Sequence, residues 1–223
     1  MQRGNNRQAC FFEEQDYKVY LDKLKIYSEK YQVNIHSYVL MTNHVHLLAT
    51  PSTTEGMSRL IQALGRYYVR YINQTYHRTG GLWEGRYKSS LVDSENYLLT
   101  VSRYIELNPV RAGMVEHPSE YPWSSYHHNA LGRTIKLITP HACYKALGKK
   151  KADRVIYYQG LFKELIPDYT LQEIRDAINK AWVLGDNKFK EQIEKQTGRR
   201  TSPMQRGGDR KSKEYHLSQN QLL

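Results

Sequence analysis

The pattern of apolar and polar positions predicts alternating helices and strands in the first half of the chain. The expected elements, in order, are a short first strand, a helix over 14–31, strands over 33–41 and 45–49, a helix over 54–78, a strand over 86–92 and a helix over 94–107. The helices carry apolar residues at every third or fourth position, and the first two long strands flank a short polar turn. This order predicts an α+β fold, a ferredoxin-like antiparallel sheet with helices on one face.

The last of these helices has clear signals at both ends. Asp93 is a candidate N-cap, and Glu95 places an acid in the first turn. The helix must end near Asn108, because Pro109 disfavours the helical conformation of the residue before it.

The pattern changes after about residue 139, where it becomes helical throughout. The expected helices cover 140–147, 152–165, 171–184 and 187–196, separated by Gly and Pro. We therefore expect a domain over residues 1–130, a helical extension over 131–197, and a basic, flexible tail over 198–223. The basic residues of the tail, which would strengthen DNA binding, are Arg199, Arg200, Arg206, Arg210, Lys211 and Lys213.

Composition narrows the function classes. The 223 residues are 39% hydrophobic, which is enough for a core, and the net charge of +11 favours a polyanionic partner, nucleic acid first. No apolar run is long enough to span a membrane and no signal peptide is recognisable, so we expect a cytoplasmic protein without a membrane partner. Two cysteines are too few for a disulfide framework, whereas nineteen tyrosines indicate a use for rings that carry a hydroxyl.

The two histidines of the His44-Val45-His46 sequence are the clearest candidates for chemistry. Alternate side chains of a strand share a face, so both imidazoles would point the same way and could bind one metal ion. The alternative is a pair of surface or hydrogen-bonded histidines without a metal.

The helix that ends before Pro109 supplies a second pair, Tyr104 and Asn108. A spacing of four places both on one helical face. If this face packs on the histidines, two imidazoles and an amide oxygen would surround a divalent cation, with a phenol beside it. Mg²⁺ or Mn²⁺ suits such a set, and imidazoles also accept Zn²⁺. The alternative for Tyr104 is one more core or rim tyrosine.

Basic residues form a stripe on the helix predicted over 54–78. Arg59, Arg66 and Arg70 share a narrow face, and Arg86 and Lys88 extend the basic surface beyond it. Together they could follow the phosphates of a nucleic acid, or they could form an ordinary solvated surface.

Three segments carry a resemblance to a known family. They read Gln2-Arg3-Gly4-Asn5-Asn6-Arg7-Gln8, Tyr38-Val39-Leu40-Met41-Thr42-Asn43-His44-Val45-His46-Leu47-Leu48 and Tyr104-Ile105-Glu106-Leu107-Asn108-Pro109-Val110-Arg111-Ala112-Gly113-Met114-Val115. In this order and spacing they resemble the single-tyrosine HUH transposases, and among these the REP-associated tyrosine transposases. The resemblance covers roughly residues 2–130.

The resemblance implies roles for individual residues. His44, His46 and Asn108 match the metal ligands, with Mg²⁺ or Mn²⁺ as the cofactor, and Tyr104 matches the nucleophile. The amino-terminal motif, implied to contact DNA, supplies Arg3, Asn5, Asn6 and Arg7. Relatives usually carry a few residues before this motif that complete the first strand, whereas here it follows Met1 directly.

The function implied is that of a metal-dependent transposase or endonuclease. It would cut and rejoin single-stranded, hairpin-associated DNA through a covalent 5′-phosphotyrosine. One alternative is a catalytically silent hairpin-binding protein or repressor with the same fold. Two others are disfavoured: the Asn108–Ala112 run argues against a replication initiator or relaxase, and Leu48 stands where a histidine-triad hydrolase needs histidine. A monomer and a homodimer both stay open.

Overall fold

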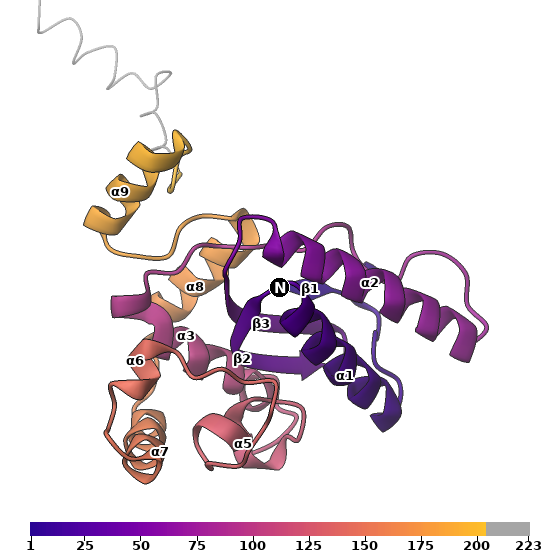
Figure 1. Cartoon of the computed structure of the whole chain (residues 1–223), viewed down its shortest axis with the longest axis horizontal. Helices are drawn as coiled ribbons and strands as arrows, with labels where there is room; N and C mark the ends of the chain where they lie inside the picture. Colours follow the sequence, from indigo (N-terminus) through magenta and orange to yellow (C-terminus); the bar gives the residue numbers. More distant parts are fainter. Residues whose placement is uncertain (204–223) are drawn as a thin grey trace, which may run out of the picture.

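The computed structural model describes residues 1–203. Its elements are β1 (Gln2–Arg3), η1 (Asn5–Arg7), α1 (Glu14–Lys30), β2 (Val33–Met41), β3 (His44–Pro51), α2 (Gly56–Thr75), α3 (Ser94–Glu106), α4 (Asn108–Arg111), η2 (Pro118–Glu120), α5 (Tyr126–Asn129), α6 (Ala142–Lys145), α7 (Lys151–Gly160), η3 (Leu161–Lys163), α8 (Asp168–Lys180) and α9 (Asn187–Thr197). Figure 1 shows their arrangement around a small sheet.

The sheet is antiparallel, with strand order β1-β3-β2. β2 and β3 form the hairpin that the sequence predicts, with Met41 paired to His44 across the turn. β1 has two residues and pairs with the start of β3, where Arg3 lies opposite His44. The histidine end of β3 is therefore held between two strands.

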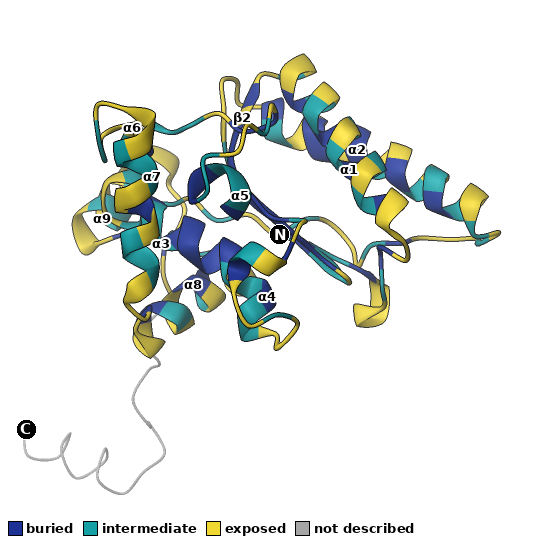
Figure 2. Cartoon of the chain, turned by 90° about the horizontal axis from the view of Figure 1, so that it is seen from below, coloured by how far each residue is buried: buried dark blue, intermediate teal, exposed yellow. Residues whose placement is uncertain are grey.

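Helices cover both faces of the sheet. Tyr38 and Leu40 of β2 pack with α1 and α2, whereas the alternate residues Val39 and Met41 pack with α3 and α8. Figure 2 shows the two groups of helices on either side of the strands. The α+β class is confirmed. The expectation that helices cover only one face of the sheet is wrong. β2 is buried on both faces, so helices must pack against each of them.

The strand expected over 86–92 is not formed. The chain there runs beside β1, where Glu84 N–H donates to the Arg3 carbonyl and Lys88 N–H to the Met1 carbonyl. Gly85 between them has a φ of 66°, which interrupts an extended backbone. Val92 pairs instead with Leu184 from the C-terminal part of the chain. The segment therefore contacts β1 with its first residues and the chain after α8 with its last residues.

α3 begins and ends close to the predicted positions. The Asp93 side chain accepts from the Glu95 N–H at 3.1 Å, as expected of an N-cap. The helix ends at Glu106, and the short α4 restarts at Asn108 with Pro109 in its first turn, where proline is tolerated.

The helical extension is joined to α3 by a buried polar cluster. The Glu106 carboxylate is fully buried and accepts from Ser125 at 2.5 Å, Asn129 at 2.8 Å and Tyr158 at 2.9 Å. Tyr158 lies on α7, so the extension contacts the helix that carries Tyr104.

The described part of the extension has the predicted helical character, with α6 to α9 close to the four expected segments. Most of the tail predicted over 198–223 lies outside the described residues, including four of its basic residues, Arg206, Arg210, Lys211 and Lys213. Within residues 1–203 no helix combines the length and the apolar character needed to cross a bilayer.

Candidate active site

The two histidines of β3 lie side by side on the face of the sheet that α3 covers. Their ring centroids are 5.2 Å apart, with the planes nearly perpendicular. The Tyr104 ring, from α3, approaches His46 with a centroid separation of 6.0 Å. The strand alternation that the sequence predicts for His44 and His46 is thus present, and the helix brings Tyr104 to the same place.

One cavity of about 250 Å³ joins these groups with Asn108. Its lining includes His44, His46, Tyr104 and Asn108. His46 and Tyr104 are almost completely buried, whereas His44 and Asn108 are partly exposed. The four residues predicted for catalysis and metal binding therefore converge, although they come from three elements, and about sixty residues separate β3 from α3 and α4 in the chain.

Both imidazoles are kept neutral by their surroundings. Burial, with the positive charges of Arg3 and the N-terminal amine, lowers the pKa of His44 to about 4. Burial also lowers the pKa of His46 well below its usual range, and the nearby cationic groups act in the same direction. A neutral imidazole keeps the lone pair that a metal ion needs.

Hydrogen bonds orient two of the candidate ligands. His44 Nδ1 lies 2.6 Å from Asn43 Oδ1, which assigns the proton to Nδ1 and leaves the Nε2 lone pair available. The Asn108 amide nitrogen donates to the carbonyls of Tyr104 at 3.1 Å and Ile105 at 3.3 Å, so its Oδ1 remains as an acceptor. Two imidazole nitrogens and one amide oxygen fit a divalent cation such as Mn²⁺ or Mg²⁺.

A set of three metal ligands at this site requires the amide oxygen of Asn108. Within residues 1–203 no cluster of three or more His, Cys, Asp or Glu side chains is placed to hold a metal ion. A metal at this site would therefore have two histidine ligands, with Asn108 and the substrate supplying the oxygens. Such an open coordination sphere is typical of catalytic rather than structural sites.

Arg111, to which the sequence analysis gave no role, packs directly against Tyr104. Its guanidinium lies over the phenol ring, 4.1 Å from the centroid, and its Nη2 donates to the Tyr104 carbonyl at 2.6 Å. The residue is seven positions after Tyr104, about two helical turns, which is the only sequence signal that points to this contact. Arg111 thus restricts the orientation of the candidate nucleophile.

The amino-terminal motif lies next to the cavity. Arg3 lines it directly, because β1 pairs with β3 at His44. Asn5, Asn6 and Arg7 are exposed in η1, where the Arg7 carbonyl accepts from the Asn43 side chain at 2.9 Å. The structure therefore places Arg3 with the candidate catalytic residues and leaves the next three residues accessible at the mouth of the β2–β3 turn.

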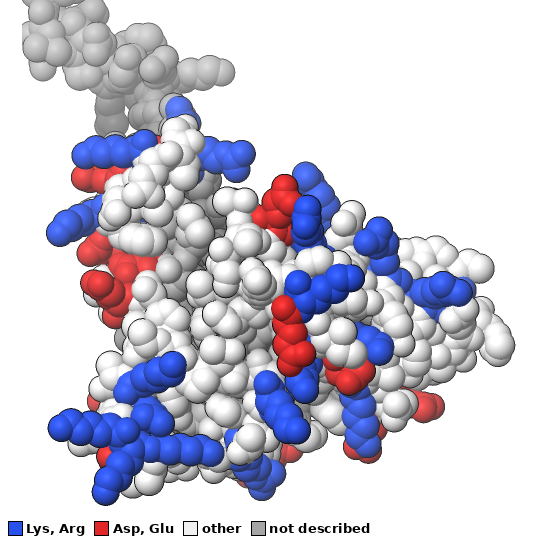
Figure 3. All heavy atoms as spheres, viewed as in Figure 1, with Lys and Arg blue, Asp and Glu red and all other residues white. Residues whose placement is uncertain are grey.

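The other predicted DNA contacts lie apart from the cavity. Arg66 and Arg70 line an open groove on α2 together with Arg78, on the opposite face of the sheet from α3. Arg59 is exposed too, but it pairs with Glu55 at 2.7 Å. Figure 3 shows basic side chains along α2, with some acidic ones between them.

Arg86 and Lys88 are exposed on the loop that runs beside β1. The backbone of this loop is bonded to the first residues of the chain, because Lys88 N–H donates to the Met1 carbonyl at 2.8 Å. Neither residue lines the groove of Arg66 and Arg70.

Sequence reasoning also missed residues of the extension. Arg175 and Asn179 of α8 line the same cavity as Tyr104, and no signal in the sequence beyond their spacing of four marks them.

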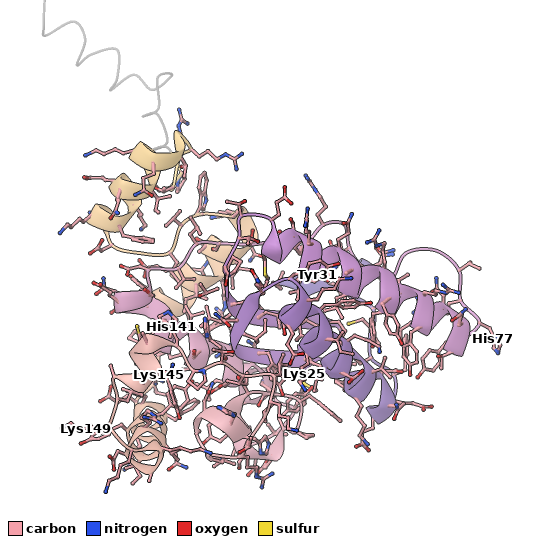
Figure 4. All side chains as sticks on the ribbon, viewed as in Figure 1. Lys25, Tyr31, His77, His141, Lys145 and Lys149 are labelled. Atoms are coloured by element: carbon pink, nitrogen blue, oxygen red, sulfur yellow. The ribbon has the colours of Figure 1, made fainter. Side chains whose placement is uncertain are left out.

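A further basic group lies at the turn between α6 and α7, where Lys149, Lys150 and Lys151 are consecutive. Figure 4 labels Lys145 and Lys149 there, on the opposite side of the molecule from His77 at the end of α2.

Comparison with known proteins supports one family. Residues 1–108 match the family model described as transposase IS200 like, a range that includes all four candidate catalytic and metal-binding residues. A curated protein of Haemophilus influenzae, named "Putative REP-associated tyrosine transposase", is 27% identical over 109 residues, which are 44% of this chain and 62% of that protein. The chain thus spans less than two thirds of this relative.

Among solved structures, a REP-associated tyrosine transposase bound to a REP hairpin aligns with a TM-score of 0.48 and 17% identity. The alignment covers 63% of this chain and 82% of that one. The likeness to the IS200-like transposase family comes from the match over residues 1–108, just under half of the chain, and does not depend on this alignment.

Proposed function

We propose that this protein is a metal-dependent transposase or endonuclease that cuts and rejoins single-stranded, hairpin-associated DNA with Tyr104 as the nucleophile. The observation that carries the proposal is the convergence of a phenol, two neutral imidazoles and an amide oxygen in one cavity. All of these groups lie within the residues that match the IS200-like transposase family.

The chemical step is a transesterification. The Tyr104 oxygen attacks the phosphorus of a phosphodiester and loses its proton, the bond to the 3′ oxygen breaks, and this oxygen takes up a proton as a free 3′-hydroxyl. The 5′-phosphate stays bound to Tyr104. Because one phosphoester replaces another, the released hydroxyl can attack in turn, which is how the same site would rejoin strands.

The residues around Tyr104 each have a part in this step. Arg111 fixes the phenol ring, and burial limits the rotamers that Tyr104 can adopt. His44, His46 and Asn108 would hold a divalent cation. When bound, such an ion polarises a phosphate oxygen and stabilises negative charge.

The partner we propose is DNA that contains a hairpin with an unpaired strand beside it. The support is the transposase family of residues 1–108, the hairpin bound by the similar solved protein, and the net charge of +11. Arg3, adjoining the exposed Asn5 and Asn6, would hold the unpaired strand at the cavity.

The test is to trap the covalent adduct. Hairpin oligonucleotides from the DNA that flanks the gene, labelled at the 3′ end, are incubated with the full chain and Mn²⁺ and resolved on a denaturing gel. We expect a labelled band at the mass of protein plus DNA. Mass spectrometry of the digested band should locate the phosphonucleotide on the peptide that contains Tyr104.

The opposite result is equally informative. Tight hairpin binding without any adduct, across Mg²⁺ and Mn²⁺, would contradict the enzymatic proposal and favour the silent hairpin-binding protein. An adduct on another of the tyrosines would keep the reaction class and reject Tyr104.

A further inference from the structure

The helical extension contributes one helix, α8, to the catalytic face of the molecule. α8 packs through the buried Ile174 and Ala177 into the same apolar cluster as Leu98 and Ile105 of α3. Figure 1 shows α8 beside α3. The face of α8 next to this apolar stripe is therefore directed at the site that α3 helps to form.

The chain after α8 fixes the helix at its C-terminal end. Leu184 N–H donates to the Leu91 carbonyl and Asp93 N–H donates to the Leu184 carbonyl, both at 2.8 Å. The Ser90 hydroxyl donates to the Trp182 carbonyl at 2.8 Å. These bonds join the end of α8 to the residues just before α3. They therefore fix the position of α8 relative to α3.

Two polar side chains of α8 face the catalytic cavity. Arg175 and Asn179 line it together with His44, Tyr104 and Asn108. They are four residues apart and so share one edge of the helix, beside the apolar stripe. Both are exposed, which leaves their donors accessible to a bound molecule.

The cavity and its rim are cationic. No Asp or Glu lines the cavity among residues 1–203, whereas Arg3 and Arg175 both do. None of Arg3, Arg111 and Arg175 forms an ion pair with a carboxylate of the described chain. Arg175 also lies close enough to Arg111 for their charges to repel. Unpaired guanidiniums in one place favour an anion between them, and a guanidinium offers a phosphate two parallel donors.

We propose that Arg175 binds a phosphate of the DNA strand at the cleavage site, with Asn179 as a second donor, so that the helical extension completes the active site. This proposal rests on the function proposed above and deepens it. The residues concerned lie beyond residue 108, where the family match ends. The extension would then be part of the catalytic unit rather than a separate module.

The experiment compares R175A with the wild type in adduct formation on the flanking-DNA hairpins. We expect the rate to fall roughly 10-fold to 100-fold. This is less than the roughly 100-fold to 1,000-fold typical of a buried, preorganised donor, because Arg175 is exposed. R175K, which keeps the charge and loses the paired donors, should lie between the two. N179A should lose a smaller factor.

The matched control is K180A on the same helix. Lys180 pairs with Asp176 at 3.2 Å and does not line the cavity. We expect wild-type rates from this variant. Thermal melting of both variants should match the wild type, because both side chains are exposed.

A binding measurement separates this proposal from the function on which it rests. In a Y104F background, the phosphates of the unpaired strand beside the hairpin are replaced, one at a time, by neutral methylphosphonates. One replacement should weaken the binding of Y104F and have no further effect on Y104F/R175A, which identifies the phosphate that Arg175 contacts. The same oligonucleotides test Arg175 even where the wild type forms no adduct.

The outcomes are therefore distinguishable. A wild type that binds hairpins without an adduct overturns the proposed reaction, and a methylphosphonate effect that still depends on Arg175 keeps the contact. Equal adduct rates for wild type and R175A, or methylphosphonate effects that are the same with and without Arg175, overturn the role of α8. Equal losses of rate in R175A and K180A would show that only the net charge of α8 matters, and would overturn the specific contact of Arg175.

Discussion

Two basic regions of this molecule differ in what surrounds their charges. In the candidate catalytic cavity, Arg3 and Arg175 lie beside His44, His46 and Tyr104, in a space lined by no described acid. On α2, Arg66 and Arg70 lie in an open groove with Val69, Asn73 and Gln74, and no group there can react with a phosphate. The two regions lie on opposite faces of the sheet.

The difference indicates that the arginines of α2 contribute to DNA affinity, whereas the residues of the cavity contribute to the reaction. Exposed arginines over an open surface gain from counterion release wherever a phosphate backbone passes, and this gain is lost with added salt. Groups held in a partly buried cavity act at one phosphate, because their positions are fixed before DNA binds. We therefore expect substitutions in the cavity to change the rate, and substitutions on α2 to change the salt dependence of binding.

The largest effect should come from Y104F. Without the phenol oxygen no adduct can form, and we expect activity to fall below detection, by at least about 1,000-fold. Hairpin affinity, measured by fluorescence anisotropy, should change less than about 2-fold, because the ring remains. Y97F, on the same helix, is the control, since the Tyr97 hydroxyl contacts Glu173 away from the cavity. Cleavage by Y104F would show that another residue attacks.

H46A should have the next largest effect. Removing one of two imidazole donors should lower the adduct rate at fixed Mn²⁺ by about 100-fold or more, and chelation with EDTA should stop the wild type reversibly. His77 is exposed at the end of α2 and supplies the control H77A. If the wild-type rate stays constant across a metal titration from zero, the ligand assignment of His44, His46 and Asn108 is wrong.

Glu106 lies two residues after Tyr104 in the sequence, and it should make stability depend on pH. Burial raises the pKa of this carboxyl from 4.5 to about 7, despite the donors that Ser125, Asn129 and Tyr158 direct at it. The folded state therefore holds a proton that the unfolded chain releases. Stability should fall as pH rises from about 4.5 to about 7, by up to about 3 kcal/mol, and level off above.

E106Q gives the matched comparison for this effect. Its amide cannot ionise, so the difference in unfolding free energy between E106Q and the wild type, from urea titrations at several pH values, should follow the Glu106 titration. A difference that does not change between pH 5 and pH 8 would contradict the raised pKa.

The smallest effect should come from R66A/R70A on α2. We expect a modest loss of affinity for every DNA tested, and a slope of log affinity against log salt that is shallower by about 1.4, or about 0.7 for each phosphate contact to a single strand. The adduct rate at saturating DNA should not change. R59A is the control, because Arg59 already pairs with Glu55. An unchanged slope in R66A/R70A would assign this face to solvent.

The hairpin, α2 and α3 could be predicted from the sequence because their signals are local. Apolar spacing placed β2 and β3, and Asp93 and Pro109 marked the two ends of the helix that carries Tyr104. The strand expected over 86–92 failed because its backbone pairs with two distant segments, which no local pattern shows.

Part of the surplus of tyrosines is explained by contacts that only the fold supplies. Tyr71 and Tyr76 donate to the buried Asp16 carboxylate, and Tyr121 and Tyr158 donate to the Leu40 carbonyl and to Glu106. With Tyr68 and Tyr144, which donate to the Cys10 and Asn129 carbonyls, six of the nineteen tyrosines satisfy acceptors on buried residues. Composition alone could not separate them from Tyr104.

The sequence by itself determined the catalytic candidates, because a strand period of two and a helical spacing of four are properties of short segments. The sequence predicted that His44 and His46 share one face of a strand and that Tyr104 and Asn108 share one face of a helix. It did not show that the two faces meet. Only the tertiary structure decided that both pairs share a cavity with Arg3, Arg111 and Arg175. Their proximity depends on how α3 and α8 pack on the sheet, and packing between distant segments leaves no periodic signal in the chain.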